Sequence, residues 1–480
     1  MLPTGRMSAI EELEAAGVEV AAPIRAVIVR LEEQIRALQA EVLDLRARLG
    51  QNSTNSSRAP SSDPPGTARP RRPSRGGKPG GQKGHPGHHR SLLPEEALDD
   101  LVPLRPTCCV HCGACLESAE EVGTPLRHQV AELPEVRAHV TEYRLLHLRC
   151  TSCGGTSMAM PPAEVGQRHF GPRLSALVCL LTGRFHLSRR QSRALLEEVV
   201  AVPPALGSVQ ALLEEGSRAL RPVWEEIRQQ VRRSRVANLD ETSWRLRGKR
   251  AWVWTAVTSG ATLFHIGRSR AARALHRLLG DRFSGVLTSD RWSAYNRHPT
   301  AHRQLCWAHL ARDCIALEES GTEASDLGAW AVRECVRLFR LWHRFRDGEI
   351  SRAELPREVA PLRARFKRLL LRLSASPVRA AARLGRSLTT LWPALWTWSR
   401  VDGVEPTNNA AERALRKAVL WRKNCFGSGS FRGLRLAERL LSVSETCRQQ
   451  HRNALEYLTQ AISAFRSGVP TPLLLPVSTN

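Results

Sequence analysis

The sequence lacks any long apolar segment. None of its 480 residues belongs to a run of 18 or more apolar residues, which is about the length that crosses a bilayer. Its beginning also lacks the basic-then-apolar order of a signal peptide. Acidic residues are scarce relative to basic ones, since 46 Asp and Glu face 71 Lys and Arg and leave a net charge of +25. We therefore expect a cytoplasmic, nucleoid-associated protein with no membrane contact and a polyanionic partner.

The length is too great for one ordinary core and predicts a multidomain α+β protein. Residues 1–50 predict a coiled-coil helix, because apolar residues recur at alternating spacings of four and three. This heptad seam predicts a homo-oligomer formed through the helix, and an amphipathic helix docked on its own domain is the alternative. The seam consists of Ile24, Ile28, Leu31, Ile35, Leu38, Val42, Leu45 and Leu49.

A basic linker follows at residues 51–91. It is rich in Ser, Pro and Gly, and eight Lys and Arg between Arg58 and Arg90 face the single Asp63. This composition is typical of a disordered segment. Its Gly-rich part contains Lys78 and Lys83, which are candidate contacts to DNA phosphates, with a merely solvated tether as the alternative.

Residues 92–166 contain two Cys-x-x-Cys motifs, each followed by glycine. Cys109 and Cys112 form the first, and Cys150 and Cys153 form the second. Four thiolates give closed tetrahedral coordination for a structural Zn²⁺, with no open position for catalysis. The pattern predicts a zinc-ribbon domain. Two alternatives remain, namely unliganded or redox thiols, and a ligand set that uses Cys108 or Cys115.

Residues 167–232 predict a helical segment. Helices are expected from Gly171 to Gly183, from Ser188 to Val199, and from a cap at Ser208 to about Leu220. The last two helices can form a helix-turn-helix-like DNA reader. The connection between them exceeds the usual turn, so a plain helical bundle carries equal weight.

Three acids occupy the ends of predicted elements in the rest of the chain. Asp240 ends a short strand that begins at Arg235, Asp290 ends a second strand, and Glu412 begins a helix. A hairpin of residues 251–257 and 261–266 is expected after the first acid. The pattern from 320 to 404 is helical throughout and predicts an insertion between the second and third acids, with its tryptophans in the core.

Three carboxylates on separate elements of a basic protein suit metal-dependent phosphodiester chemistry. Hard Mg²⁺ prefers a few carboxylates and keeps other positions for water and phosphate. We expect Asp240 to be shared by two Mg²⁺ (or Mn²⁺) ions, Asp290 to complete one ion and Glu412 the other. Glu241 is a less favoured ligand because it points to the other side of the strand. His309 is a possible accessory residue, with a structural histidine as the alternative.

Basic residues near the third acid are candidate DNA contacts. Arg413 and Arg416 follow Glu412 on the same helix, where they can hold DNA phosphate or neutralise the carboxylates. Arg422 and Lys423 lie at its far end. Asn408 and Asn409 precede the helix and are expected to cap it.

These motifs together resemble bacterial transposases of the insertion-sequence-66 (IS66) family. The resemblance rests on Asp240-Glu-Thr-Ser-Trp, Ser289-Asp290, Cys306-Trp-Ala-His309, Asn408-Asn-Ala-Ala-Glu412 and Gly427-Ser-Gly, together with the upstream cysteine motifs and Gly80-Gly-Gln-Lys-Gly-His-Pro-Gly87. One departure is Arg291-Trp292 after Asp290, where the family commonly has Gly-Tyr.

The resemblance implies an RNase H-like catalytic core with an Asp-Asp-Glu triad of Asp240, Asp290 and Glu412. That core would consist of residues 233–319 and 405–465, split by the insertion of residues 320–404 and followed by a tail at 466–480. The implied activity is DNA transposition, with cleavage at terminal inverted repeats of double-stranded DNA and strand transfer into target DNA. Accessory proteins encoded by the element are implied partners. The alternatives are an endonuclease without strand transfer and an inactive DNA-binding remnant.

Overall fold

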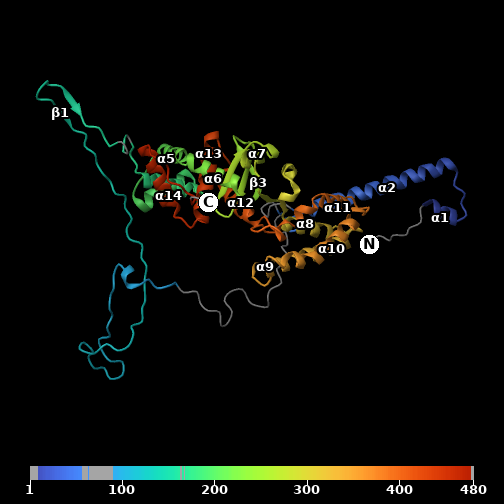
Figure 1. The fold of residues 1–480 in the computed structure, drawn as a ribbon, viewed down its shortest axis with the longest axis horizontal. Coiled ribbons are helices and arrows are strands. Elements are labelled where there is room, and N and C mark those ends of the chain that lie inside the picture. The colour runs from blue at the N-terminus through green and yellow to red at the C-terminus, as the bar shows by residue number, and fades with distance from the viewer. Residues whose placement is uncertain (1–8, 57–62, 64–89, 163–164, 167, 477–480) are drawn as a thin grey trace.

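The computed structural model describes residues 9–56, 63, 90–162, 165–166 and 168–476. Within these residues the protein combines helices with a two-stranded and a five-stranded sheet, so the expected mixed α+β class is confirmed (Figure 1). In the described part of the chain, no helix has the length and apolar character needed to cross a membrane.

The N-terminal region begins with two helices, α1 (Ala9–Ala15) and α2 (Ala22–Leu49). Figure 1 shows α2 extending away from the main body. Its heptad residues are largely exposed, as Leu31 at 50% and Leu38 at 60% illustrate. The apolar seam is therefore not covered by the described part of this chain.

Residues 52–56, which belong to the predicted linker, form a turn. The Asn55 side chain donates to the backbone oxygen of Gly50 and, at 2.8 Å, to Glu319 in the main body. Ser53 donates to Asp63. Asparagine and serine side chains satisfy their own backbone in this way and hold a tight turn. Residues 57–62 and 64–89, which include Lys78 and Lys83, lie outside the described residues.

The segment of residues 90–162 is extended and largely exposed. It carries a short 3₁₀ turn, η2 (Glu95–Ala97), and one hairpin of β1 (His147–Arg149) and β2 (Thr156–Met158). Each Cys-x-x-Cys motif forms a tight local turn, closed by bonds from Gly113 N–H to Cys109 and from Gly154 N–H to Cys150.

The main sheet has the strand order β5-β4-β3-β6-β7. Its strands are β3 (Val236–Leu246), β4 (Lys249–Val257), β5 (Thr262–Gly267), β6 (Val286–Ser289) and β7 (Arg303–Leu305). The first three are antiparallel neighbours, and β6 and β7 run parallel to β3. The predicted hairpin corresponds to β4 and β5.

The predicted end of the first strand at Asp240 is wrong. β3 continues to Leu246 and pairs with β4 along its whole outer half. Beyond Leu246 the chain reverses in two residues, because Arg247 and Gly248 adopt positive φ values of 51° and 73°. Asp240 therefore lies inside β3, just beyond the point where the parallel partner β6 ends.

Helices pack against the sheet and against one another. The strands are contacted by α6 (Arg221–Arg233), α7 (Ala272–Leu279), α12 (Asn409–Cys425) and α13 (Phe431–Gln449). Other helices are the main contacts of α3 (Pro172–Gly183), α4 (Arg189–Val200), α5 (Leu206–Ala219) and α14 (Ala454–Ser467). The expected cap at Ser208 is wrong, since α5 begins at Leu206 after Ala205. The rigid Pro203-Pro204 pair ends just before this point and leaves the chain extended. Ser188 does cap α4, where Gln191 completes a capping box.

A second hydrophobic core fills the helical insertion. It consists of α8 (Trp307–Glu318), α9 (Ser325–Arg346), α10 (Leu355–Ser374), α11 (Arg379–Thr390) and the 3₁₀ turns η5 (Trp392–Leu395) and η6 (Thr397–Ser399). Trp396 and Trp398 are fully buried there, and Trp307 packs on Phe366 and Trp396. Trp396 and Trp398 of the predicted insertion are core residues, as expected, and Trp307, which precedes the insertion, shares their core.

Candidate active site

Two of the predicted acids lie at the same level of neighbouring parallel strands. The pairing of β3 with β6 ends at Asn238 and Thr288. Asp240 and Asp290 each come two residues later, so the two carboxylates leave adjacent chains at one edge of the parallel pair. Both residues are half-buried.

The third acid, Glu412, is brought to these strands by the start of α12. Asn408, fully buried, donates its side-chain amide to the backbone oxygen of Leu239 at 2.6 Å. This bond ties the start of the helix to the residue before Asp240. The expected capping role of Asn408 is wrong, because its side chain makes no bond to the helix. It joins the helix to the strand instead.

The pKa of Asp240 depends on its burial and on the neighbouring acids. Burial raises the pKa of Asp240 well above its usual range, and the negative charges of Glu241, Asp290 and Glu412 raise it further. The opposing effect is a 2.9 Å hydrogen bond from the backbone N–H of Glu241. Like charges held this close disfavour ionisation unless a cation joins them.

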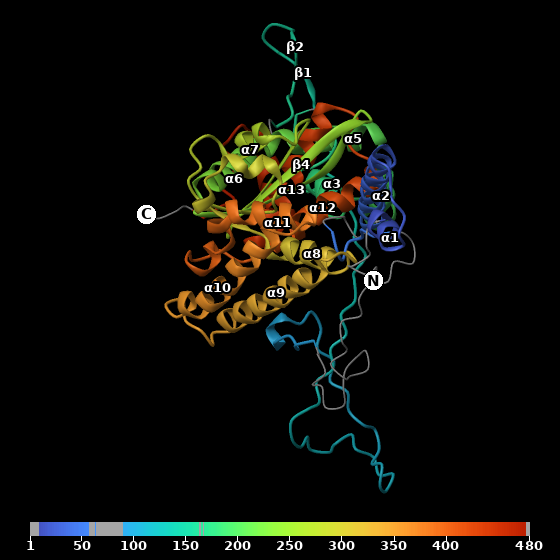
Figure 2. The same ribbon diagram turned by 90° about the vertical axis from the view of Figure 1, so that its right-hand side faces the viewer.

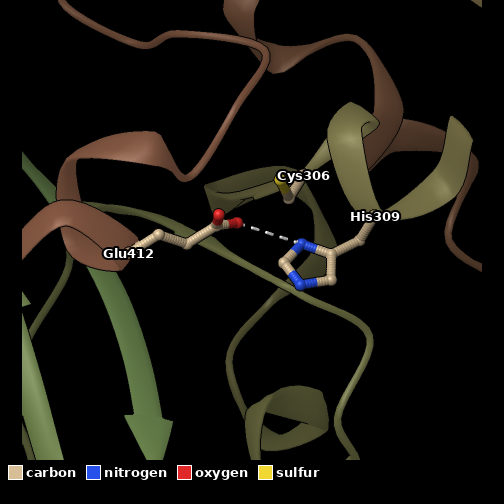
Figure 3. A group of neighbouring side chains, drawn as sticks. All are labelled: Cys306, His309 and Glu412. Carbon is tan, nitrogen blue, oxygen red and sulfur yellow. Dashed lines mark ion pairs between the residues drawn. The ribbon is translucent and has the colours of Figure 1, made fainter. Parts of the chain in front are cut away.

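Glu412 also faces the start of α8 (Figure 3). His309 Nδ1 lies 3.4 Å from Glu412 Oε1, and an Arg312 nitrogen lies 3.9 Å from Oε2. His309 Nδ1 and Glu412 Oε1 are both buried without a hydrogen-bond partner. The ligand atoms of Cys306, His309 and Glu412 all lie within 4.8 Å of one another. His309 therefore belongs to the site rather than to the core alone.

Cys306 in this group acts as an anchor. Burial, followed by the nearby charge of Glu412, raises the pKa of its thiol to about 11, so the thiol stays protonated at neutral pH. Its sulfur accepts a 3.2 Å hydrogen bond from the backbone N–H of Asn408. The Cys-x-x-His spacing on one helical turn was the sequence signal for this group, but it did not reveal the contact with Glu412.

Glu241 points away from the acids into a separate buried network. Its carboxylate accepts from Arg270 at 3.0 Å and from the hydroxyl of Tyr295 at 2.5 Å. The Arg270 guanidinium also lies over the rings of Trp252 and Trp292. Sequence reasoning missed this network, because its members are distant in the chain and carry no motif.

The Arg291-Trp292 departure leaves Asp290 well held. Arg291 pairs with Asp313 on α8 at 2.5 Å, and the backbone N–H of Trp292 donates to Asp290 Oδ1 at 2.8 Å. The loop after β6 is therefore tied to the same helix that presents His309.

The donor set fits divalent cations. Asp240, Asp290 and Glu412 supply hard carboxylate oxygens. Burial raises the pKa of Asp240, and the charges of Glu241, Asp290 and Glu412 raise it further. The unpartnered Glu412 Oε1 is available to a ligand. The chemistry of these carboxylates suits Mg²⁺ or Mn²⁺. The cluster with metal-ligand spacing among the described residues joins Glu412 to His309 and Cys306, and it does not include Asp240 or Asp290.

The structure does not bring the four predicted zinc cysteines together. Each motif has a local cradle: backbone N–H groups of His111 and Cys112 lower the pKa of Cys109, and those of Cys153 and Ser152 lower that of Cys150. Among the described residues, however, the group around Glu412 is the one cluster with metal-ligand spacing. The four-cysteine zinc site remains a prediction.

The candidate DNA contacts near α12 differ in their surroundings. Arg413, Arg416 and Lys423 are exposed. Arg422 instead donates to Ser243 Oγ at 2.6 Å and to its backbone oxygen, which fixes the far end of α12 on β3. Its main role visible here is structural.

Three neighbouring acids on a mixed sheet, in a strongly basic chain, indicate an enzyme that acts on nucleic acid. Comparison with family models narrows this class. Residues 168–436 match the Transposase IS66 family, and the chain belongs to that family. Residues 2–91 match a family of unknown function, DUF6444.

Two curated relatives come from Sinorhizobium fredii, and both are named as uncharacterized proteins. The chain is similar to y4qI with 29% identity over 46% of this chain and 45% of that protein. It is similar to y4hP with 24% identity over 81% of this chain and 76% of that protein. The chain thus spans a little under half the length of the first relative and about three quarters of the second.

Proposed function

We propose that the protein is a DNA transposase that cleaves strands at transposon ends and joins the freed 3′-hydroxyl to target DNA. The observation that carries the proposal is the approach of Asp290 and Glu412 to Asp240. After burial and the charge of Glu241, the charges of these two acids also raise the pKa of Asp240. Family membership supports the transposase role. The strand order, with β4 antiparallel among five strands, is the one expected of an RNase H-like core.

In this proposal the carboxylates hold two divalent ions. Such a pair, when bound, supplies an activated water and stabilises the leaving oxygen. Asp240 would contact both ions, Asp290 one and Glu412 the other. Because β3, β6 and α12 are each fixed by backbone or buried side-chain bonds, the oxygens are set before substrate arrives.

The chain's own residues orient the substrate around these acids. Arg312 lies beside Glu412 and can contact a phosphate oxygen once the glutamate is engaged. His309 Nδ1, without a hydrogen-bond partner, can hold a proton or donate to the reacting phosphate. The backbone N–H of Trp292 holds the Asp290 carboxylate, and the Trp292 ring lies against the Arg270 guanidinium.

The test is cleavage of DNA that carries the element's ends, with purified full chain and Mg²⁺ or Mn²⁺. Wild type should nick at the end, and Asp240→Asn should bind DNA while cutting at least about a thousandfold more slowly. Asp402→Asn is the matched control, because it removes an exposed carboxylate outside the set. Equal cleavage by Asp240→Asn and wild type would reject the assignment.

A second DNA substrate distinguishes a transposase from an endonuclease that cuts without joining. A pre-cleaved end with a free 3′-hydroxyl should yield joined products with target DNA if the protein is a transposase. Persistent cutting without joined products would favour the endonuclease, and binding with neither product would favour an inactive remnant.

The N-terminal regions would serve DNA binding and assembly in this proposal. The exposed heptad seam of α2 supports pairing of two protomers through a coiled coil. The cysteine segment would bind a structural Zn²⁺, and it and the basic linker would contact the inverted repeats. Accessory element-encoded proteins remain proposed partners.

A further inference from the structure

A basic cleft of about 1200 Å³ lies apart from the three acids. It is formed by the ends of α3 and α12, the starts of α4, α5 and α13, and the loop of residues 427–430. Figure 2 shows α3, α5, α12 and α13 grouped beside the sheet. Its lining contains a single glutamate, Glu214, and six arginines: Arg189, Arg190, Arg218, Arg432, Arg435 and Arg439.

Three helices begin at this cleft. Ser188 caps α4, whose first two residues are Arg189 and Arg190, Leu206 begins α5, and Ser430 caps α13. Each helix start carries unpaired N–H groups and a partial positive charge. The helices are 12, 14 and 19 residues long. An anion in the cleft would meet all three of these positive ends.

The cationic side chains are available for a ligand. Arg189, Arg190 and Arg432 are exposed, and no ion pair among the described residues involves them. By contrast, Arg435 pairs with Glu438 at 2.8 Å and Arg439 donates to the Ser217 backbone. The first three arginines thus form the free cationic face of the cleft.

An independent sign of a missing ligand is Thr182 on α3. Its side chain is part of the cleft lining, the residue is 6% exposed, and its hydroxyl is buried without a hydrogen-bond partner. A buried hydroxyl without a partner carries a desolvation cost that an acceptor in the cleft would offset. The two indoles of the lining, Trp244 and Trp421, are buried and present no stacking platform for a base.

We infer that this cleft binds the phosphodiester backbone of DNA. The inference relies on the proposed function for the identity of the polyanion. Trp244 lies four residues beyond Asp240 on the same face of β3, which is about 13 Å along the strand. A DNA backbone bound by Arg189, Arg190 and Arg432 would therefore continue toward the acids. Its position in the cleft would determine which phosphate of the DNA strand reaches them.

The test measures DNA affinity of the full chain in an Asp240→Asn background, with a fluorescein-labelled duplex of arbitrary sequence over a series of salt concentrations. The variant is Arg189→Gln/Arg190→Gln/Arg432→Gln. The matched control is Arg379→Gln/Arg383→Gln/Arg386→Gln, which removes the same charge from exposed positions of α11.

The cleft variant should bind at least about tenfold more weakly, and its salt slope should fall by about 1 for each arginine. The control should keep the wild-type slope. Equal losses in both variants would overturn the inference, because they would report net charge alone. Binding does not require cleavage, so failure of the proposed chemistry in wild type would show separately, in the cleavage assay.

Two further measurements address structure and ligand source. Thr182→Val should keep or raise the melting temperature, since it removes an unpartnered hydroxyl, yet weaken DNA binding about threefold; unchanged binding would count against the site. Competition of inorganic phosphate with DNA, at an ionic strength matched with chloride, distinguishes a site for free phosphate from a site for DNA. If the arginine variant loses phosphate competition but binds DNA like the control, the DNA assignment is overturned.

Discussion

The sheet that carries the acids and the segment that carries the cysteines differ in how far their apolar side chains are buried. Leu239, Val253 and Leu287 in the sheet are fully buried. In the cysteine segment Leu104 and Val110 are each 90% exposed, and all residues of β1 and β2 are exposed. The sheet is stabilised by apolar burial. The described cysteine segment has no such core, and we expect a metal or a partner to order it.

The largest expected effect concerns metal in the cysteine segment. Zinc binding should contribute an apparent free energy of about 10–16 kcal/mol to ordering that segment. Cys150→Ser/Cys153→Ser should abolish bound zinc measured by atomic emission, while the melting temperature of the main domain stays unchanged. Cys425→Ser, an exposed thiol outside both motifs, is the control. A preparation of wild type without zinc would contradict the prediction.

The sheet region should respond most strongly to loss of its buried ion pair. Glu241→Gln leaves Arg270 without its charged partner and weakens the bond from Tyr295. We expect the free energy of unfolding to fall by about 2–4 kcal/mol, less than for a fully buried pair because Arg270 is one third exposed. Denaturant unfolding measures it. No loss of stability would show that the network is not what holds this part of the sheet.

Acid should destabilise the core through His186. Burial, and then the charge of Lys417, lowers its pKa to about 4 from an ordinary value of 6.5. Because the unfolded chain binds this proton more tightly, the stability is fully present above pH 6.5 and is lost as the pH falls toward 4, by about 3 kcal/mol. His186→Phe keeps a ring against Trp421. Its stability should be less pH-dependent over that range, as measured by denaturant unfolding, and an unchanged profile would exclude His186 as the cause.

The smallest effect per residue is expected at the heptad seam. Leu31→Lys/Leu38→Lys should cost about 2 kcal/mol for each leucine in the oligomer and shift the protein toward monomer in sedimentation. Val27→Lys/Val29→Lys changes the same charge at exposed positions off the seam and serves as control. If the seam variant keeps the oligomeric state of wild type, assembly does not use α2.

Local patterns identified the pieces of the main domain, and tertiary contacts decided how they join. The β4–β5 hairpin, the start of α8 at Trp307 and the burial of Trp396 follow from residue preference and spacing. The outer half of β3 does not, because its charged residues are typical of loops while its pairing with β4 overrides them.

The candidate site shows the same division. Three acids at element ends were predicted because each stands next to a short apolar run or a helix start. The bridge from Asn408 to Leu239 joins positions 169 residues apart, and no local pattern carries it. The same holds for the contact of His309 with Glu412.

The most direct measurement of the central claim is Mn²⁺ binding to the DNA-bound full chain, followed by electron paramagnetic resonance. Wild type should hold two Mn²⁺ ions per chain. Asp240→Asn should lose both, and Asp290→Asn and Glu412→Gln should each weaken one. Asp402→Asn, which removes an exposed carboxylate outside the set, should bind both ions. Wild-type binding in Asp240→Asn, or equal loss in Asp402→Asn, would contradict a shared site of Asp240, Asp290 and Glu412.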